Sequence, residues 1–364
     1  MRALFVFLGD YNVMEVIINT VIQPIFKLDN SYIYKYNNNF VEISNIDLVD
    51  FLRKALSNSS LSCEELAKKL CENFDFSFED ASELIADLID SGFLTEAVKK
   101  NRYYTNSLFF SLFDNKNKKV FQSNLENSEI CVLGLGGSTL IIQQLAQLGI
   151  GKITGVDFDT LEESNLNRQV VFREKDVGNL KTDVLEKSLK EINSDLQYDF
   201  KNIYVDSSEK IRDIISTADI VILALDEPII DSSLWVYNEC KLQKKKIISG
   251  GVWGDNITYT YFDYSIDNQP CYQCLLDEDL NRDEITRTYI ENVRGKHFSN
   301  FNTTTIFTGS VLAGIITTEI TKILTSYSTP LSSGTTLTLN TSTWELNMQN
   351  IIVKKLCLSC EKEY

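Results

Sequence analysis

The sequence has little positive charge. Its 364 residues include 35 lysines and arginines against 51 aspartates and glutamates, which gives a net charge of −16. Proteins that bind nucleic acids or anionic membranes nonspecifically depend on basic side chains to neutralise phosphate. We therefore expect neither a nucleic acid nor a membrane as a partner, although a local basic pocket for a nucleotide is compatible with this charge.

Long hydrophobic runs are also missing. No apolar stretch reaches the roughly 20 residues that a membrane-spanning helix needs. The N-terminal segment MRALFVFLGDYNVMEV is partly apolar but lacks the small-residue cleavage site of a secretory signal. These absences predict a cytoplasmic protein, and the length suffices for two domains with a large core.

Histidine is nearly absent, whereas cysteine is not. The single histidine, His297, is most simply a surface residue. Four of the eight cysteines form two pairs, Cys271-Tyr-Gln-Cys274 and Cys357-Leu-Ser-Cys360. Two such pairs supply the four thiolates of a tetrahedral zinc site, and zinc there would attach the C-terminal segment to the preceding domain. A redox-active pair is the alternative, but a redox motif does not need a matching second pair.

Residues 1–98 form the first predicted domain, with short strands followed by three helices. Two of the helices begin at capping boxes, Ser62-Cys-Glu-Glu65 and Ser77-Phe-Glu-Asp80, and Gly92 ends the last. The strands are expected at 3–8, 13–19, 24–28, 32–36 and 41–44, and the first helix at 46–57.

This order of elements is winged-helix-like, and winged helices often bind DNA. Residues 1–100 hold 9 basic and 16 acidic residues, so DNA binding is disfavoured. The arrangement of Leu66, Ser77, Leu88 and Gly92 resembles instead the small peptide-recognition domain of enzymes that modify ribosomal peptides. Such domains hold a leader peptide as an added β-strand. An inert structural domain is the remaining alternative.

Residues 99–128 are expected to be a polar connector, and residues 129–364 a second domain. Its strands and helices alternate, which predicts an α/β fold with a doubly wound, mainly parallel Rossmann-like sheet. Strands are expected at 130–133, 153–156, 218–225, 335–339 and 343–346, and helices at 138–148, 181–193 and 304–325.

A glycine-rich loop follows the first of these strands. Gly134, Gly136 and Gly137 lie between strand and helix, where backbone amides can approach phosphates closely and the helix N-terminus favours anions. Asp157 ends the next strand, in the position where a carboxylate accepts hydrogen bonds from a ribose. These features suit NAD as well as ATP, so a nicotinamide-dependent dehydrogenase is one hypothesis.

Three further charged residues favour ATP. Arg168 lies in the motif Asn165-Leu-Asn-Arg-Gln169, Lys181 begins a helix, and Asp226 follows an apolar strand. Ligands bind beyond the carboxyl ends of such strands. Two cations and one carboxylate suit a triphosphate with Mg2+, whereas a dinucleotide needs no such set.

Together these motifs resemble the E1-like adenylating superfamily of the ThiF and MoeB type. The resemblance runs over about residues 101–364, from Arg102-Tyr103 through the glycine loop, Val156-Asp-Phe-Asp-Thr160 and both cysteine pairs. Within the family it is greatest to the branch that adenylates antibiotic precursor peptides of the microcin C7 and pantocin A type. The resemblance implies ATP, Mg2+ and Zn2+ as cofactors, a precursor peptide as partner and a homodimer.

The resemblance also implies roles for single residues. Asp157 would bind the ribose, Arg168 and Lys181 the phosphates and Asp226 the Mg2+, while Asn165 lines the site. Arg102 belongs to the nucleotide contacts, but Thr105 replaces a second arginine that usually reaches the partner subunit's nucleotide.

Two other hypotheses concern the substrate. Adenylation of a sulfur-carrier or ubiquitin-like protein is one, and a non-catalytic scaffold that only presents a leader peptide is the other. Residues 275–303, where related enzymes carry a cysteine that accepts the acyl group, contain no cysteine. A thioester step is therefore not expected.

Overall fold

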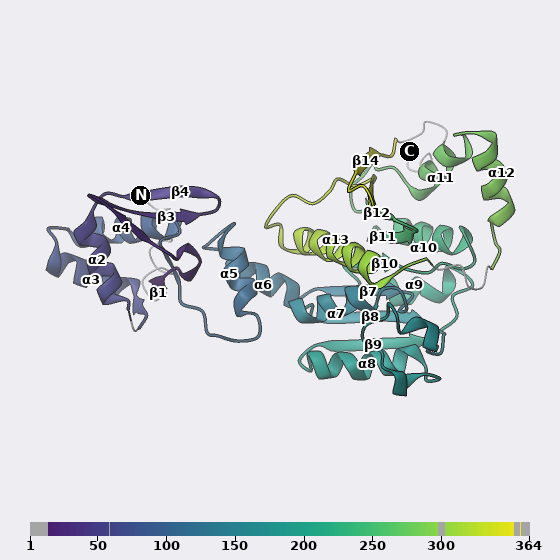
Figure 1. Ribbon diagram of the computed structural model, residues 1–364, viewed down its shortest axis with the longest axis horizontal. Helices are drawn as coiled ribbons and strands as arrows, with labels where there is room; N and C mark the ends of the chain where they lie inside the picture. The colour runs from purple at the N-terminus through teal and green to yellow at the C-terminus, as the bar shows by residue number, and fades with distance from the viewer. Residues whose placement is uncertain (1–13, 58, 298–302, 353–356, 358–364) are drawn as a thin grey trace. The chain divides into compact units, whose positions relative to one another are not determined.

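The computed structural model describes residues 14–57, 59–297, 303–352 and 357. It divides into two compact units, residues 1–123 and 124–364 (Figure 1). The strand expected at 3–8 and the cysteine Cys360 lie outside the described residues.

The first unit combines helices with two small antiparallel sheets, ordered β5-β1-β6 and β2-β3-β4. Its strands are β1 (Glu15–Ile18), β2 (Phe26–Leu28), β3 (Ser31–Tyr36), β4 (Asn39–Ile43), β5 (Leu61–Ser62) and β6 (Leu94–Glu96). Its helical elements are η1 (Thr20–Ile22), α2 (Ile46–Ala55), α3 (Cys63–Asn73), α4 (Phe78–Asp90), α5 (Tyr104–Ser111) and α6 (Lys118–Glu126), of which the last crosses the division.

The sequence accounts for the helix starts in this unit. At Ser62 and Ser77 the hydroxyl accepts from the backbone amide three residues on, and the acidic side chain there accepts from the serine amide. These reciprocal bonds satisfy amides that have no partner inside the helix. Both capping boxes are as predicted from the sequence, whereas the winged-helix character is not confirmed.

The segment expected as a connector is partly helical and packs with the first unit. Asn115 Nδ2 donates to the carbonyls of Ile89 at 3.0 Å and Leu94 at 2.7 Å. Lys118 is 2% exposed, and its ammonium donates to the Thr95 hydroxyl and, at 2.9 Å, to the Glu96 carbonyl. Buried polar contacts of this kind need a fixed arrangement, so the structural division falls after Ser123 rather than at residue 98.

The second unit is an α/β domain around one sheet of eight strands, ordered β14-β13-β12-β11-β10-β7-β8-β9. Strands β11, β10, β7, β8 and β9 run parallel, and β12, β13 and β14 are antiparallel. The strands are β7 (Glu129–Leu133), β8 (Lys152–Asp157), β9 (Gln197–Asn202), β10 (Ile220–Leu223), β11 (Lys246–Trp253), β12 (Asn256–Asp263), β13 (Thr335–Asn340) and β14 (Leu346–Asn350).

Helices pack on this sheet, as Figure 1 shows. The helical elements are α7 (Thr139–Leu148), η2 (Glu163–Asn165), η3 (Glu174–Asp176), α8 (Lys181–Ile192), α9 (Glu209–Ile215), α10 (Asp231–Leu242), α11 (Tyr272–Leu280), α12 (Glu284–Val293) and α13 (Ile306–Thr325). Among the described helices, α13 alone has the length and apolar composition of a membrane span. It packs on β11, β12 and α7, as expected for a buried core helix.

The predicted doubly wound, mainly parallel sheet is confirmed, but its last strand was misplaced. The sequence suggested a strand at 343–346, whereas β14 begins at Leu346. Asn340 Oδ1 accepts from the amides of Ser342 and Thr343, both at 3.0 Å, and Trp344 has a φ of 60°. These features make a tight turn there instead of extended chain.

Candidate active site

The carboxyl ends of β7, β8 and β10 meet at one edge of the sheet. Strand β7 lies between β8 and β10. The chain adds β8 and β9 on one side of β7 and then returns to add β10 on the other side, so the strand order reverses at β7. In open α/β sheets such a switch point is a crevice where ligands bind.

The glycine loop follows β7 and approaches its neighbours closely. Gly134 has a φ of +94°, and a Cβ there would lie 2.5 Å from the Ala224 carbonyl oxygen, so a larger residue would not fit. At Gly136 a Cβ would lie 3.0 Å from Gln169 Nε2 and 3.3 Å from Lys181 Nζ. At Gly137 no atom of the described residues lies within 4 Å of an added Cβ. The loop thus leaves room beside the N-terminus of α7.

Two cations lie beside this loop. Lys181 is 6% exposed, and its Nζ is 2.6 Å from Asp159 Oδ2. Arg168 is half-buried, and its Nη1 donates to the Ser164 carbonyl and to Asn167 Oδ1, both at 2.8 Å. Both side chains are held by their neighbours, which fixes positive charge at the crevice.

Asp157, at the end of β8, is buried and bonded to the backbone. Its Oδ2 accepts from the Leu135 amide and its Oδ1 from the Asp159 amide, both at 2.8 Å. Burial raises the pKa of this carboxyl, although the charge of Lys181 and the two amides act in the opposite direction. Each oxygen has a second lone pair that remains available to a hydroxyl group.

Asp226 follows β10 and is accessible to solvent at the crevice. Partial removal of its carboxyl from water raises the pKa of Asp226, and the negative charges of Glu227 and Asp159 raise that pKa further. Lys181 lowers it. A cluster of carboxylates of this kind is stabilised when a cation joins it.

These residues line one cavity of about 470 Å3. It brings together every residue that the sequence predicted for a nucleotide site in the second unit: Gly134, Gly136, Gly137, Asp157, Asn165, Arg168, Lys181 and Asp226. Arg102 is exposed and belongs to the first unit, before α5. Its part in the site stays a prediction.

The cavity also contains residues that sequence reasoning missed. Asp159 is one, and its position two residues after Asp157 on the same motif was a usable signal. Gln169 is another, because it is 4% exposed and its Oε1 has no hydrogen-bond partner among the described residues. Phe158 and Tyr204 form an edge-to-face pair with ring centroids 4.7 Å apart on the wall. No sequence signal connected Tyr204 to this site.

A short segment after α12 forms hydrogen bonds and ion pairs with the residues that follow Asp226. We call residues 294–297 the latch segment. Its backbone bonds with Ile229 twice, through the Gly295 amide at 3.0 Å and the Lys296 carbonyl at 3.1 Å. Arg294 Nε lies 2.9 Å from Asp231 Oδ1, and His297 Nδ1 lies 3.0 Å from Glu227 Oε2. His297 thereby lines the same cavity as the residues predicted for the nucleotide, a position that the sequence did not indicate. We call this cavity of about 470 Å3 the nucleotide cavity, after that prediction.

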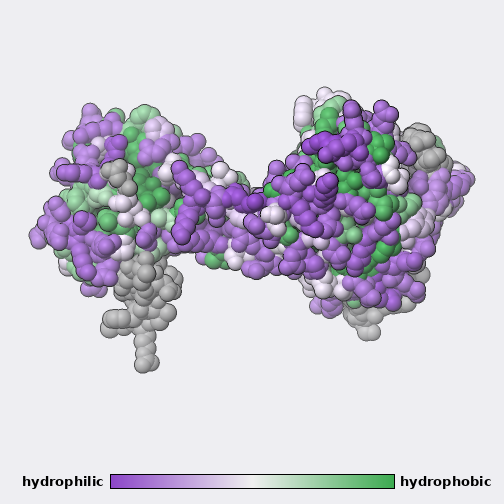
Figure 2. Space-filling model, turned by 90° about the horizontal axis from the view of Figure 1, so that it is seen from below, coloured by the Kyte–Doolittle hydropathy of each residue, from purple (hydrophilic) through white to green (hydrophobic). Residues whose placement is uncertain are grey.

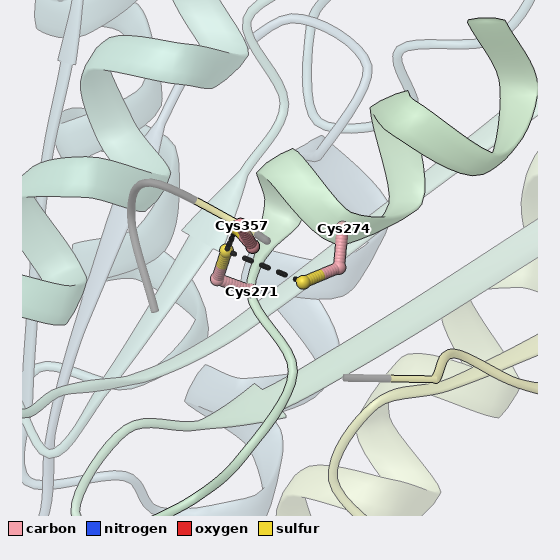
Figure 3. A group of neighbouring side chains, drawn as sticks. All are labelled: Cys271, Cys274 and Cys357. Atoms are coloured by element: carbon pink, nitrogen blue, oxygen red, sulfur yellow. Dashed lines mark hydrogen bonds between the residues drawn. The ribbon is translucent and has the colours of Figure 1, made fainter. Parts of the chain in front are cut away.

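Three of the four paired cysteines meet elsewhere in the second unit (Figure 3). The Sγ of Cys271 lies 3.8 Å from that of Cys274 and 3.6 Å from that of Cys357, and all three thiols are buried. A Zn–S distance of about 2.3 Å in a tetrahedron gives sulfur atoms about 3.8 Å apart. The three thiols therefore have the spacing of zinc ligands.

Comparison with known proteins agrees with this arrangement. A family model described as ThiF family matches residues 104–360. An adenylyltransferase and sulfurtransferase, MOCS3, from Dictyostelium discoideum is 35% identical over 159 residues, which cover 42% of this chain and 35% of the relative. A molybdopterin-synthase adenylyltransferase from Escherichia coli is 32% identical over 155 residues, which cover 42% of this chain and 61% of the relative. The chain thus matches less than two thirds of either relative.

Solved structures match more of the chain. The structure of E. coli MccB with ATP has a TM-score of 0.71 at 23% identity and covers 95% of this chain and 100% of its own. The microcin C7 biosynthetic enzyme MccB in complex with N-formylated MccA has a TM-score of 0.72 at 22% identity, with 95% and 100% covered. PaaA reaches 0.64 at 21% identity, with 79% and 96% covered. These similarities establish the fold, and in the MccB structures it includes both units.

Proposed function

Because the chain belongs to the ThiF family, we propose that it is an ATP-dependent adenylyltransferase that activates a carboxylate of a ribosomally synthesised precursor peptide during maturation of a peptide antibiotic. The observation that carries this proposal is the single cavity at the switch point, which contains the glycine loop, Arg168, Lys181 and Asp226. A nicotinamide dehydrogenase, the alternative that the glycine loop left open, has no support from the family match.

Adenylation makes a poor electrophile reactive. A carboxylate oxygen attacks the α-phosphorus of ATP, a new P–O bond forms, and the bond to the bridging oxygen breaks as pyrophosphate leaves. The carboxylate is already ionised, so no general base is required. The protein contributes positioning and neutralisation of the charge that develops on the phosphates.

The nucleotide contacts follow from the geometry of the cavity. The amides of the glycine loop and of the α7 N-terminus would hold phosphate oxygens, together with Arg168 and Lys181. Asp157 would accept hydrogen bonds from the ribose, and Asn165 would line the same wall. The aromatic pair of Phe158 and Tyr204 offers an apolar surface for the base.

Asp226 would hold Mg2+, with Glu227 and Asp159 close enough to raise the pKa of its carboxyl. Oxygen ligands of this kind fit the preference of Mg2+, which usually combines one or two carboxylates with water and phosphate oxygens. When bound, the ion would withdraw charge from the leaving pyrophosphate.

We propose that the first unit binds the leader part of the peptide and contributes no catalytic group. An apolar hollow of about 510 Å3 lies beside β2 and β4, the edge strands of one of its sheets. Phe26 and Phe40 line it and are 63% and 79% exposed. Figure 2 shows apolar surface, in green, on the visible face of this unit. Strand edges with no pairing partner among the described residues, beside an apolar hollow, suit an added peptide strand.

A sulfur-carrier or ubiquitin-like protein is the second candidate substrate. The sequence relatives favour it, since they include MOCS3 and a molybdopterin-synthase adenylyltransferase. The match of both units to MccB favours the peptide. A non-catalytic scaffold is the least favoured, because the Arg168, Lys181 and Asp226 set is complete.

We also propose a structural zinc ion held by Cys271, Cys274, Cys357 and Cys360. The spacing of the three described thiols supports it, and zinc in such a site holds the chain together without taking part in the reaction. Metal analysis of the purified protein should give one zinc per chain. Cys357→Ser should lower thermal stability more than it lowers ATP affinity, and a protein without zinc would contradict the proposal.

A homodimer is the proposed assembly, as in related enzymes. Light scattering at micromolar concentration should give twice the mass of one chain. A monomer under these conditions would count against the homodimer. It would agree with Thr105, which replaces the arginine that usually reaches the partner subunit's nucleotide.

The test of the function is peptide-dependent exchange of labelled pyrophosphate into ATP. If a small open reading frame beside this gene encodes a precursor peptide, that peptide should drive exchange, and a small carrier protein ending in Gly-Gly should not. Exchange with the carrier alone would establish the second candidate. Absence of exchange with both would refute adenylation.

A further inference from the structure

Tyr264, which directly follows β12, is a buried tyrosine whose hydroxyl is not bonded. Its side chain is 7% exposed, and its Oη has no hydrogen-bond partner among the described residues. Buried hydroxyls in folded proteins are nearly always paired, because an unpaired one has lost its bonds to water without replacement. The unpaired Tyr264 hydroxyl therefore raises the question of which group completes its bonding.

A series of aromatic rings connects Tyr264 to the start of α11, where two of the three thiols lie. The Tyr264 ring stacks on that of Phe262, with centroids 5.7 Å apart. Phe262 packs edge-to-face on Tyr237 at 5.4 Å, and Tyr237 stacks on Tyr272 at 4.4 Å. Tyr272 directly follows Cys271 in the chain. Tyr264 and all three thiols belong to one buried cluster, so the unpaired hydroxyl lies in the same core as the proposed zinc site.

The groups around the Tyr264 hydroxyl indicate which of them could accept its proton. Burial raises the pKa of this hydroxyl, and Tyr237 and Cys271 raise that pKa further, whereas the backbone of Tyr272 lowers it. A backbone group that lowers the pKa of a hydroxyl does so as an amide donor, and an amide cannot accept a proton. Cys271 raises the pKa because its thiolate would repel a phenolate. The hydroxyl thus keeps its proton beside a sulfur atom that can accept it.

The other two tyrosine hydroxyls of this cluster already have partners. The Tyr237 hydroxyl donates to the Ser249 hydroxyl at 2.7 Å. The Tyr272 hydroxyl bonds with the side chain of Ser233. Within the part of the cluster that the structure describes, Tyr264 is therefore the tyrosine with a hydroxyl left over for a thiolate.

We propose that the Tyr264 hydroxyl donates a hydrogen bond to the Cys271 thiolate when zinc is bound, and so orients and stabilises this ligand. The inference rests on the proposed zinc site. Zinc requires its cysteines as thiolates, and a buried thiolate is stabilised by donors around the metal. Tyr264 would touch neither ATP nor peptide, so it is a positioning residue of the metal site.

A matched pair of variants tests the bond. Tyr264→Phe removes only the hydroxyl, and the affinity for zinc, measured by competition with a chelator, should fall at least about tenfold. Tyr259→Phe is the control. The Tyr259 hydroxyl is also buried and without a partner among the described residues, but Tyr259 does not belong to the thiol cluster. Its loss should leave the zinc affinity unchanged.

Cobalt gives a readout that a purely structural role of Tyr264 would not change. Co2+ can replace Zn2+ among thiolates, and its sulfur-to-metal charge-transfer bands move to lower energy when the sulfur donates more strongly. Loss of the hydrogen bond should therefore shift these bands to lower energy in Tyr264→Phe and leave them unchanged in Tyr259→Phe. Replacing Tyr264 by 3-fluorotyrosine makes the hydroxyl a stronger donor and should shift the bands to higher energy. This replacement also serves if the phenylalanine variant does not fold.

Two failures are distinguishable. If the unchanged protein holds zinc, but Tyr264→Phe matches it in zinc affinity and cobalt spectrum, the hydrogen bond is wrong while the zinc site stands. If the purified protein contains no zinc and cobalt produces no charge-transfer bands, the proposed zinc site itself fails.

Discussion

Arg168 and Asp226 are charged residues that line the nucleotide cavity, and they should act on the reaction rather than on folding. Loss of a preorganised charge at the reacting phosphate costs roughly 3 kcal/mol, or about a hundredfold in rate. Arg168→Ala and Asp226→Ala should each reduce peptide-dependent pyrophosphate exchange by about this factor. Their melting temperatures should stay close to that of the unchanged protein, since neither side chain is buried in the core.

Lys175→Ala is the matched control, because Lys175 is exposed on η3 and does not line the nucleotide cavity. Its exchange rate should be normal. Normal exchange in both the Arg168 and Asp226 variants would exclude adenylation at this cavity.

Lys118 should make the stability of the first unit depend on pH in an unusual direction. Burial lowers the pKa of its ammonium to about 8, whereas a lysine in the unfolded chain titrates at roughly 10.4. Between these values the unfolded chain binds more protons than the folded one, so the free energy of unfolding rises with pH. Below about pH 8 both states are protonated and this dependence disappears.

The measurement is denaturant unfolding of the unchanged protein and of Lys118→Met from pH 7 to 10. The unchanged protein should gain stability relative to the variant above pH 8. Lys119→Met is the control, because the neighbouring Lys119 is exposed and pairs with Glu96 at the surface. A constant difference between the unchanged protein and Lys118→Met would show that burial of Lys118 does not control its titration.

At the scale of elements, the latch segment connects α12 to the loop that carries Asp226. His297 and Glu227 should act as a pair in nucleotide binding, because the loop from 227 to 230 directly follows Asp226 in the chain. His297→Ala and Glu227→Gln should each weaken ATP binding by about threefold to tenfold, and the double variant should be no weaker than the worse single one. Calorimetric titration with ATP measures all four proteins.

Arg282→Ala serves as the control for this cycle. Arg282 forms an exposed ion pair with Asp279 at the end of α11 and does not line the nucleotide cavity, so ATP affinity should not change. Additive effects of His297→Ala and Glu227→Gln would mean that the two residues act independently.

The sequence predicted the elements whose signals are local. Apolar runs identified β7, β8 and β10, and the Ser62 and Ser77 capping boxes gave the starts of α3 and α4 within one residue. The residues predicted for a nucleotide site in the second unit lie together because a parallel sheet brings its strand ends together. Strand β14 was placed too early in the chain. Its residues alternate apolar and polar, but all five are exposed, so no core packing marks its bounds.

Long-range contacts were not predictable in the same way. His297 lies 70 residues from Glu227, and no local pattern records that pairing. The helices of residues 99–123 were taken for a connector because their composition is polar, whereas buried hydrogen bonds from Asn115 and Lys118 tie them to the first unit. Tertiary contacts determine where His297 and the helices of residues 99–123 lie, and the local sequence does not contain that information.

For the whole molecule, the division after Ser123 gives the boundary at which the two proposed activities should separate. A chain of residues 124–364 should still bind ATP, more weakly by the contact predicted for Arg102, but should lose modification of the full precursor because the leader-binding unit is missing. Residues 1–123 alone should bind the precursor peptide. Fluorescence anisotropy with labelled peptide measures binding by residues 1–123, and mass spectrometry measures the loss of precursor modification by residues 124–364.

A cut after residue 98 is the informative comparison. It would remove Leu94 and Thr95, the partners of Asn115 and Lys118, and should give a less stable protein than the cut after 123. Normal modification of the precursor by residues 124–364 would show that the first unit has no part in recognition.

The thiol cluster has a consequence for how the second unit tolerates oxidation. Cys271 and Cys357 are 86 residues apart in the chain, and their sulfur atoms lie 3.6 Å apart. A cross-link over a loop of this length restricts the unfolded chain by about 4 to 5 kcal/mol. Helix α13 and the latch segment both belong to that loop. Once a chelator has removed the proposed zinc, the same proximity favours a disulfide between Cys271 and Cys357 under oxidising conditions, and this bond would close the same loop. A chelator with a reductant should then destabilise the second unit far more than a chelator alone.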